Sequence, residues 1–266
     1  MITETYQRRF SGIQRLYGEK SGPLLQQAHF CVVGIGGVGS WAVEALARSG
    51  VGKITLIDFD EICETNINRQ LPALSNTVEQ KKCQVMAQRI ALINEECQVT
   101  VIDDFITAQN YQQYLEQGYD YVIDAIDSIK FKSLMINHCK RNKIPLIVTG
   151  GAGGMTDPTQ IQLADLTKTY NDPLLAKVRS QLRKEYGFSK EGKKKFGVEC
   201  IFSSQQPLYP KEDGTVSGEK PGIHGVSLDC RFGYGAASFI TANFGFMAAG
   251  VAINKLMAKG MSPAKA

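Results

Sequence analysis

The chain has 266 residues, of which 43% are hydrophobic and 21% charged, so it can bury a sizeable core and lacks the composition of a disordered protein. The formal net charge of +4 is mildly basic, which is compatible with a nucleic-acid substrate but does not indicate one. None of the seven cysteines forms a C-x-x-C pair, which excludes the usual spacing of a thiolate zinc site and favours reduced thiols over a disulfide framework.

The first half of the chain predicts alternating strands and helices. Residues 1–28 form a polar N-terminal segment of helical character, without the apolar stretch of a secretory signal, so we expect a cytoplasmic protein. Residues 29–156 predict a nucleotide-binding core with strands at 29–35, 53–60, 98–105, 119–127 and 144–154, and helices within 41–50, 77–94, 111–119 and 128–143. This order predicts an α/β fold, a Rossmann-like, doubly wound, mostly parallel sheet with helices on both faces.

Residues 157–266 predict a C-terminal extension that completes the same domain. Residues 159–166 indicate a strand of a different region, and residues 168–220 are polar and lysine-bearing, which favours part helix and part mobile loop. Residues 236–254 carry no charge over nearly the length of a membrane-spanning helix. Because their apolar residues are mostly small and two asparagines interrupt them, we expect a buried helix folded onto the sheet, and no membrane span.

A glycine-rich turn joins the first strand to the first helix of the core. Gly34, Gly36 and Gly39 have G-x-G-x-x-G spacing, with Gly37 as an additional glycine. Such a turn lets a phosphate approach the backbone at a helix N-terminus. Asp58 ends the next strand, where an acidic residue can bind a ribose hydroxyl. The pattern predicts nucleotide binding but does not choose between NAD, FAD and ATP.

Charged residues near the expected carboxyl edge of the sheet favour ATP. Arg69 and Lys82 are candidates for the β- and γ-phosphates, and Asp127 or Asp60 for Mg²⁺. A structural ion pair of Arg69 and a solvated position of Lys82 on a helix face are the alternatives. An NAD-dependent oxidoreductase is a second hypothesis, which these two cations disfavour.

The segments GIGGVGS, TLIDFD, NINRQ and AID, together with Lys82, resemble the E1-like superfamily of adenylating enzymes over nearly the whole chain. Within it, RRFSGIQRLYG and the lack of zinc cysteines are most similar to the branch of tRNA threonylcarbamoyladenosine dehydratases. The resemblance implies that Gly37 contacts the nucleotide, Asp58 its ribose, and Asn66, Asn68, Arg69 and Lys82 the phosphates, while Asp127 holds Mg²⁺. Arg69, Lys82 and Asp127 are then the catalytic candidates.

The sequence departs from the wider superfamily at three places. An N-terminal arginine that reaches the partner subunit's ATP is replaced by Arg15 in a shifted register, or by Arg8 or Arg9. Ser128 stands where an asparagine is common, and the zinc cysteine pairs are missing.

The resemblance implies ATP-dependent dehydration, with cyclisation, of the threonylcarbamoyl group on the adenosine next to the tRNA anticodon, through an acyl-adenylate. The alternatives are adenylation of the C-terminal glycine of a ubiquitin-like sulfur-carrier protein and a non-catalytic nucleotide-binding partner. The implied partners are tRNA, a second copy of the chain and a cysteine desulfurase system. Because the nucleophile is tethered, we expect Cys200 and Cys230 to be bystanders.

Basic residues of the 168–220 segment are candidates for contact with RNA phosphates: Arg179, Arg183, Lys184, Lys190, Lys193, Lys194 and Lys195. The aromatic residues between them, Tyr186, Phe188 and Phe196, are candidates for stacking on a base. A solvated loop is the alternative for this segment.

Overall fold

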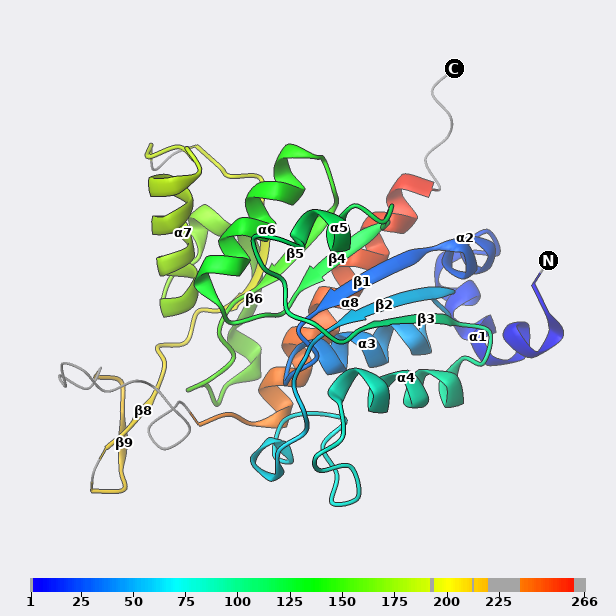
Figure 1. Cartoon of the computed structure of the whole chain (residues 1–266), viewed down its shortest axis with the longest axis horizontal. Coiled ribbons are helices and arrows are strands. Elements are labelled where there is room, and N and C mark those ends of the chain that lie inside the picture. Colours follow the sequence, from blue (N-terminus) through cyan, green and yellow to red (C-terminus); the bar gives the residue numbers. More distant parts are fainter. Residues whose placement is uncertain (1, 192–193, 212, 220–234, 261–266) are drawn as a thin grey trace.

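The computed structural model describes residues 2–191, 194–211, 213–219 and 235–260, and seven of its strands form one sheet (Figure 1). The spatial order is β3 (Gln98–Ile102), β2 (Lys53–Ile57), β1 (His29–Val33), β4 (Tyr121–Asp124), β5 (Leu146–Thr149), β7 (Glu199–Ser203) and β6 (Ile161–Asp165). Neighbouring strands are parallel except at the edge, where β6 runs antiparallel to β7. The strand order reverses between β1 and β4, which creates the crevice where doubly wound sheets bind ligands.

Helices cover both faces of this sheet, as the alternating strands predicted (Figure 1). One face carries α3 (Gly39–Arg48), α4 (Lys82–Ile93) and α8 (Ser238–Gly260), and the other carries α5 (Tyr111–Leu115), α6 (Ile129–Arg141) and α7 (Pro173–Glu185). The alternation of side chains along β1 explains the two layers: Phe30 and Val32 pack toward α3 and α8, whereas Cys31 and Val33 pack toward α6.

The N-terminal segment forms α1 (Glu4–Tyr17) and α2 (Ser21–Gln27), in agreement with its helical pattern. Thr3 caps α1 by accepting a hydrogen bond from the backbone N–H of Tyr6. The Tyr6 hydroxyl donates to the carbonyl of Gly50, which lies just before β2. This bond holds α1 at the amino edge of the sheet.

Helix α8 is the buried C-terminal helix that the sequence predicted. Phe244, Ala248, Ala249 and Ala252 have no exposed surface and pack in the core between α3 and the sheet. Its length and composition would also allow a membrane span, but 56% of its most apolar window is buried inside the chain.

Three expectations about the elements were wrong. Residues 159–166 contain β6, which joins the main sheet rather than a different region, and residues 168–220 contain β7, which no pattern indicated. The helix predicted from residue 77 begins at Lys82, because Glu79 has a left-handed backbone (φ 69°) that a helix cannot contain. Residues 157–266 thus supply two strands of the main sheet, β6 and β7, and two helices that pack on its faces, α7 and α8.

The remaining described elements are short. They comprise the 3₁₀ helices η1 (Glu64–Asn66), η2 (Pro158–Gln160) and η3 (Leu166–Lys168), and the two-stranded ribbon of β8 (Tyr209–Pro210) and β9 (Val216–Ser217).

Candidate nucleotide-binding site

The glycine turn lies at the carboxyl end of β1 and leads directly into α3 (Figure 1). Gly34 has a positive φ of 88°, which glycine adopts without strain. A Cβ on Gly39 would collide with the carbonyl of Gly34, so only glycine lets α3 start this close to the strand. A Cβ on Gly36 would meet only the Gln70 side chain, at 3.8 Å, so this backbone is open to a ligand. The turn therefore has the form of a phosphate-binding loop at a helix N-terminus.

Asp58 follows β2 and faces the same turn. Its carboxylate accepts hydrogen bonds from the backbone N–H of Ile35, at 2.6 Å, and of Asp60, at 2.8 Å. Burial raises the pKa of Asp58, and these two N–H donors act in the opposite direction. Asp58 thus shapes the turn as well as lying where a ribose hydroxyl could bind.

Lys82 points toward the carboxyl end of β2. It is the first residue of α4, its Nζ lies 2.8 Å from Asp60 Oδ2, and its side chain is only 6% exposed. This position contradicts the alternative of a solvated helix face. The neighbouring Lys81 is also partly buried: its side chain is 24% exposed, and its Nζ donates to the Phe59 carbonyl at 2.8 Å.

Arg69 lies against the glycine turn. Its Nη1 donates to the Thr65 carbonyl at 2.7 Å and to Asn68 Oδ1 at 3.0 Å, and its Cγ is 3.6 Å from the position of a Cβ on Gly37. These partners are neutral, so the alternative of a structural ion pair with an acid finds no support among the described contacts. The guanidinium is held by oxygen atoms of its own loop, next to the expected phosphates.

The two asparagines of this loop differ in their contacts. Asn68 is exposed and donates to the carbonyl of Ala236 at 2.7 Å. Asn66 is buried, and its Oδ1 accepts from the backbone N–H of Cys63 at 3.1 Å, which caps η1. That oxygen therefore shapes the loop, and a bond to phosphate, which only the amide Nδ2 could donate, stays a prediction.

Asp127 is exposed in the loop that follows β4. The described residues contain no group of three or more His, Cys, Asp or Glu side chains that could hold a metal ion by themselves. A single exposed carboxylate fits Mg²⁺ that takes its other ligands from water and ATP phosphates, as is usual for this ion.

A buried ion pair that the sequence did not predict holds this loop. Asp124 ends β4 and Lys132 lies in α6; both side chains have no exposure, and Lys132 Nζ is 2.7 Å from Asp124 Oδ1. The same oxygen accepts from the backbone N–H of Ile126 at 3.2 Å. One signal was present: Lys132 shares the helical stripe of Met135, Ile136 and Cys139, where an apolar residue is expected.

Thr241 of α8 is a further residue that the sequence did not reveal. Its hydroxyl donates to the carbonyl of Arg69 at 3.1 Å, and its methyl group is 3.2 Å from the position of a Cβ on Gly37. The C-terminal helix therefore contacts both the turn and the loop that carries Arg69, and no local pattern could indicate a contact over this distance in sequence.

The N-terminal arginines do not reach this site within the chain. Helix α1 lies at the amino edge of the sheet, where Arg8 pairs with Glu4 and Arg9 with Glu95. Arg15 is exposed and donates to Ser11 Oγ at 3.2 Å. Its expected contact with ATP therefore requires a second subunit and stays a prediction.

Of the two cysteines expected to be bystanders, the structure describes Cys200 and leaves Cys230 untested. Cys200 has no exposure and burial raises the pKa of its thiol well above the usual range, so it does not supply a thiolate nucleophile. Cys230 lies outside the described residues.

The expected RNA contacts are partly taken up by the chain itself. Arg179 bonds to Thr169 and the Leu166 carbonyl, and Arg183 to the Ser189 carbonyl. Phe196 is only 5% exposed, so the expectation that it stacks on a base is wrong. Lys184, Lys190, Lys194 and Lys195 are exposed, whereas Lys193 lies outside the described residues.

Comparison with known proteins agrees with this geometry. Residues 6–265 match the model of the ThiF family. The chain is 55% identical to the tRNA threonylcarbamoyladenosine dehydratase of Escherichia coli K12 over 260 residues, 97% of each chain. It is 56% identical to the protein of the same name from Haemophilus influenzae over 256 residues, 96% of each.

A solved structure is similar over the same extent. The structure of the Escherichia coli dehydratase in complex with ATP has a TM-score of 0.88 and 52% identity, with 98% of both chains covered. The chain therefore belongs to the ThiF family, within which it groups with the tRNA threonylcarbamoyladenosine dehydratases.

Proposed function

We propose that this protein catalyses the ATP-dependent dehydration and cyclisation of N6-threonylcarbamoyladenosine in tRNA. The observation that carries the proposal is the set of groups at one edge of the sheet. An open glycine turn at a helix N-terminus, the acid Asp58 and the two cations Arg69 and Lys82 converge there. Near full-length identity to dehydratases, one of which was solved with ATP, supports the choice of substrate.

The reaction proceeds in two steps. The threonylcarbamoyl carboxylate attacks the α-phosphorus of ATP, the bond to the bridging oxygen breaks, and pyrophosphate leaves. A nucleophile within the same modified nucleoside then attacks the acyl carbon, and AMP leaves with the former carboxylate oxygen. The net change in the nucleoside is the loss of one water. Because the second nucleophile is tethered, the protein contributes mainly positioning and charge stabilisation.

The residues take distinct parts in the first step. The backbone N–H groups of the turn and the N-terminus of α3 bind phosphate oxygens, and Asp58 binds the ribose. Arg69 and Lys82 stabilise the charge that develops on the leaving pyrophosphate. Lys82 exchanges its bond with Asp60 for phosphate, which frees the Asp60 carboxylate. A Mg²⁺ ion held by Asp127 would neutralise phosphate charge when bound.

Pyrophosphate release from ATP and Mg²⁺ tests the proposal, with tRNA that carries the threonylcarbamoyl group compared against an unmodified transcript. We expect release only with the modified tRNA, together with a nucleoside lighter by one water in mass spectrometry. Release with the unmodified transcript, or no change in nucleoside mass, would contradict the dehydratase function. In that case the C-terminal glycine of a ubiquitin-like sulfur carrier becomes the carboxylate to test.

We extend the proposal to the assembly. The active form is a cytoplasmic homodimer in which Arg15 of one subunit reaches the ATP of the other, and a cysteine desulfurase system is a partner. The exposed position of Arg15 on α1 supports a contact in trans. Light scattering tests the dimer. Mixing an Arg15→Ala subunit with an Arg69→Ala subunit tests the trans contact, because mixed dimers regain one complete site.

A further inference from the structure

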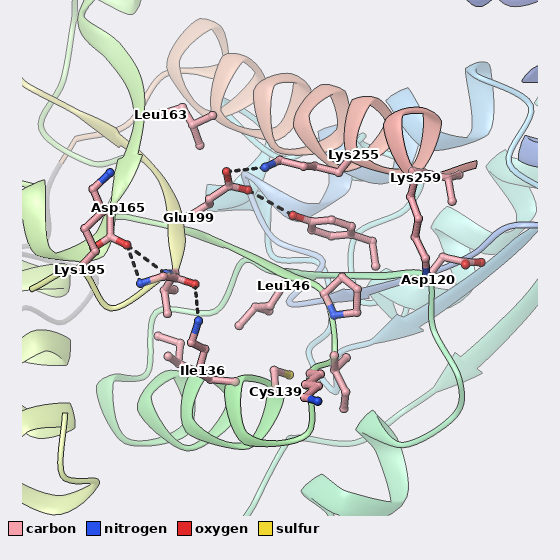
Figure 2. A pocket seen from close by; sticks show the side chains of 18 of the residues that line it. Asp120, Ile136, Cys139, Leu146, Leu163, Asp165, Lys195, Glu199, Lys255 and Lys259 are labelled. Carbon is pink, nitrogen blue, oxygen red and sulfur yellow. Dashed lines mark hydrogen bonds and ion pairs between the residues drawn. The ribbon is translucent and has the colours of Figure 1, made fainter. Parts of the chain in front are cut away.

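A second pocket lies at the opposite edge of the sheet from the glycine turn (Figure 2). It has a volume of about 800 Å³ and is lined by the first residues of three strands, Tyr121 of β4, Leu146 of β5 and Glu199 of β7. The nucleotide site lies at the carboxyl ends of the same sheet, one strand length away, or about 13–17 Å. The pocket is therefore separate from the proposed ATP site.

The lining combines an apolar floor with a basic rim. The floor includes Ile136, Ile144, Leu146, Val198 and Leu256. The five lysines of the rim come from three parts of the chain: the end of α6 and the residues after it, the loop before β7, and the end of α8. They are Lys140, Lys143, Lys195, Lys255 and Lys259.

Three carboxylates also line the pocket, but each has donors of its own. Asp165 accepts from the backbone N–H groups of Phe196, Gly197 and Val198. Asp120 accepts from the backbone N–H of His29 at 2.9 Å. The five lysines therefore outnumber the carboxylates by two formal positive charges.

The third carboxylate, Glu199, forms the ion pair of the pocket. Its Oε1 lies 2.9 Å from Lys255 Nζ. Lys140 donates to the carbonyl of Gly197 at 3.1 Å, which is a neutral partner.

Like Lys140, three further lysines have no acidic partner within 4 Å among the described residues: Lys143, Lys195 and Lys259. Figure 2 shows Lys195 and Lys259 on opposite sides of the pocket, with the Glu199–Lys255 pair between them. Lys143 has a left-handed backbone (φ 56°), a conformation that has a lower energy for glycine or asparagine than for lysine. Ammonium groups that surround a cavity and lack counter-charges create a local attraction for anions.

We propose that this pocket binds phosphate groups. The size suits a nucleotide-sized ligand, with the apolar floor under its non-ionic part and the lysines on its phosphates. The phosphates have two possible sources, a free phosphate compound or the phosphodiester backbone of an RNA strand. The site goes beyond the proposed function, because neither adenylation nor ring closure needs it.

Lysine reactivity measured residue by residue tests this site. The folded protein is reductively methylated at about 0.1 M salt, where exposed charges more than ~10 Å apart are screened. Mass spectrometry then gives the labelling rate of each lysine alone, with inorganic tripolyphosphate, or with an unmodified tRNA transcript. Lys20 and Lys211 are exposed, do not line the pocket and serve as internal references.

We expect Lys143, Lys195 and Lys259 to be labelled several-fold more slowly with a probe, while the two reference lysines change little. Protection by tripolyphosphate identifies a free phosphate compound as a ligand, and protection by tRNA alone identifies the RNA backbone. Protection by neither probe, or equal protection of the reference lysines, overturns the proposal. Slow labelling of the three lysines without any probe also overturns it, because the pocket is then covered by another copy of the chain.

A pair of double variants controls for net charge. Lys195→Ala with Lys259→Ala removes two positive charges from the pocket, and Lys20→Ala with Lys211→Ala removes two elsewhere. We expect the Lys195→Ala, Lys259→Ala variant to abolish the protection of Lys143 by the phosphate probe, and the Lys20→Ala, Lys211→Ala variant to keep it. All four side chains are exposed, so these variants should fold. Because the readout is lysine labelling, failure here leaves the pyrophosphate assay and the proposed function untouched.

Discussion

Arg69 contributes to the fold with its main chain and to the site with its side chain. Its carbonyl accepts from Trp41 Nε1 at 3.2 Å and from the Thr241 hydroxyl, and both bonds survive a change of side chain. The guanidinium, by contrast, bonds to neutral oxygens of its own loop, and to no other group in the part of the chain that the structure describes. Truncation of the Arg69 side chain to alanine therefore removes its part in the site and keeps its part in the fold.

We predict that Arg69→Ala lowers the rate of tRNA-dependent pyrophosphate release by at least about 100-fold, the usual cost of losing one stabilising donor. Its free energy of unfolding should change by less than about 1 kcal/mol, because partly exposed hydrogen bonds contribute little. Kinetics and urea denaturation measure the two effects. Arg141→Ala is the control, since Arg141 is exposed and bonds only to Asn137 on its own helix. A strongly destabilised Arg69→Ala protein would mean that Arg69 is structural.

Lys132 neutralises the buried end of β4. Burial raises the pKa of Asp124, and Lys132 opposes that shift, while Asp124 Oδ2 has no hydrogen-bond partner. We predict that Lys132→Met lowers the free energy of unfolding by about 3–5 kcal/mol, because it leaves a buried charge unpaired. Adding Asp124→Asn should recover much of this loss, and denaturant titration of both proteins measures it.

The exposed Lys130 on the same helix gives the matched control. Lys130→Met should stay within about 0.5 kcal/mol of the wild type. If the double variant is no more stable than Lys132→Met, the charge of Asp124 is not the cause of the loss.

The site residues that the sequence predicted lie close to recognisable motifs. The positions of Gly34, Gly39, Asp58 and Lys82 at this edge of the sheet could be predicted, because each follows a strand or begins a helix at a characteristic spacing. Lys132 and Thr241 could not, because their roles depend on which helix packs against which strand. For Asn66 the structure adds a cap that the sequence did not indicate, since its Oδ1 accepts from Cys63, and its predicted contact with phosphate stays a prediction.

At the scale of elements, Glu44 connects α3 to α4. Its carboxylate accepts from Arg89 through both oxygens, at 2.7 and 2.8 Å, and from Arg48 at 2.7 Å. Burial acts to raise the pKa of Glu44, but the bonds from Arg89 and Arg48 outweigh it and lower the pKa. A lowered pKa in the folded state stabilises the protein above the unfolded-state pKa of about 4.3.

We predict that Glu44→Gln destabilises the protein by about 1–3 kcal/mol at pH 7, as expected for a charged hydrogen-bonded group that is lost. The difference from the wild type should shrink as the pH falls from about 5 toward the lowered pKa, because the wild-type carboxylate is then protonated as well. Urea denaturation at several pH values gives both quantities. A difference that is constant with pH would show that the loss does not come from the charge.

The contact between α3 and α8 depends on Gly245. A Cβ at this position would collide with the Val38 carbonyl and lie 2.8 Å from the backbone nitrogen of Ala42. By contrast, a Cβ on Gly250 of the same helix would have no neighbour within 4 Å among the residues that the structure describes. A substitution at Gly245 therefore tests close packing between the helices, and one at Gly250 tests helix propensity.

We predict opposite effects of alanine at the two positions. Gly250→Ala should stabilise the protein by about 0.5–1 kcal/mol, which is the propensity gain. Gly245→Ala should destabilise it by about 1–3 kcal/mol, because overpacking outweighs that gain. Thermal and urea denaturation decide the signs, and equal signs would contradict the close packing of α3 and α8.

At the scale of the whole molecule, strands β1 to β5 could be predicted, whereas β7, and the place of β6 beside it, could not. Strands β1 to β5 are apolar runs that alternate with helical patterns, which is typical of a doubly wound sheet. Strand β7 follows a lysine-rich loop and has polar residues at both ends, and β6 is half exposed, so neither shows the long apolar run of a buried strand. Their pairing becomes visible only in three dimensions.

The hydrogen bond between Thr241 and Arg69 spans 172 positions of the chain. At a synthesis rate of about 5–20 residues per second, α8 leaves the ribosome roughly 9–34 s after the loop that carries Arg69. Until then the apolar side of the sheet that α8 covers has no partner, so the nascent protein needs protection from aggregation over that interval. The same order of events keeps an unfinished chain from holding ATP in a complete site.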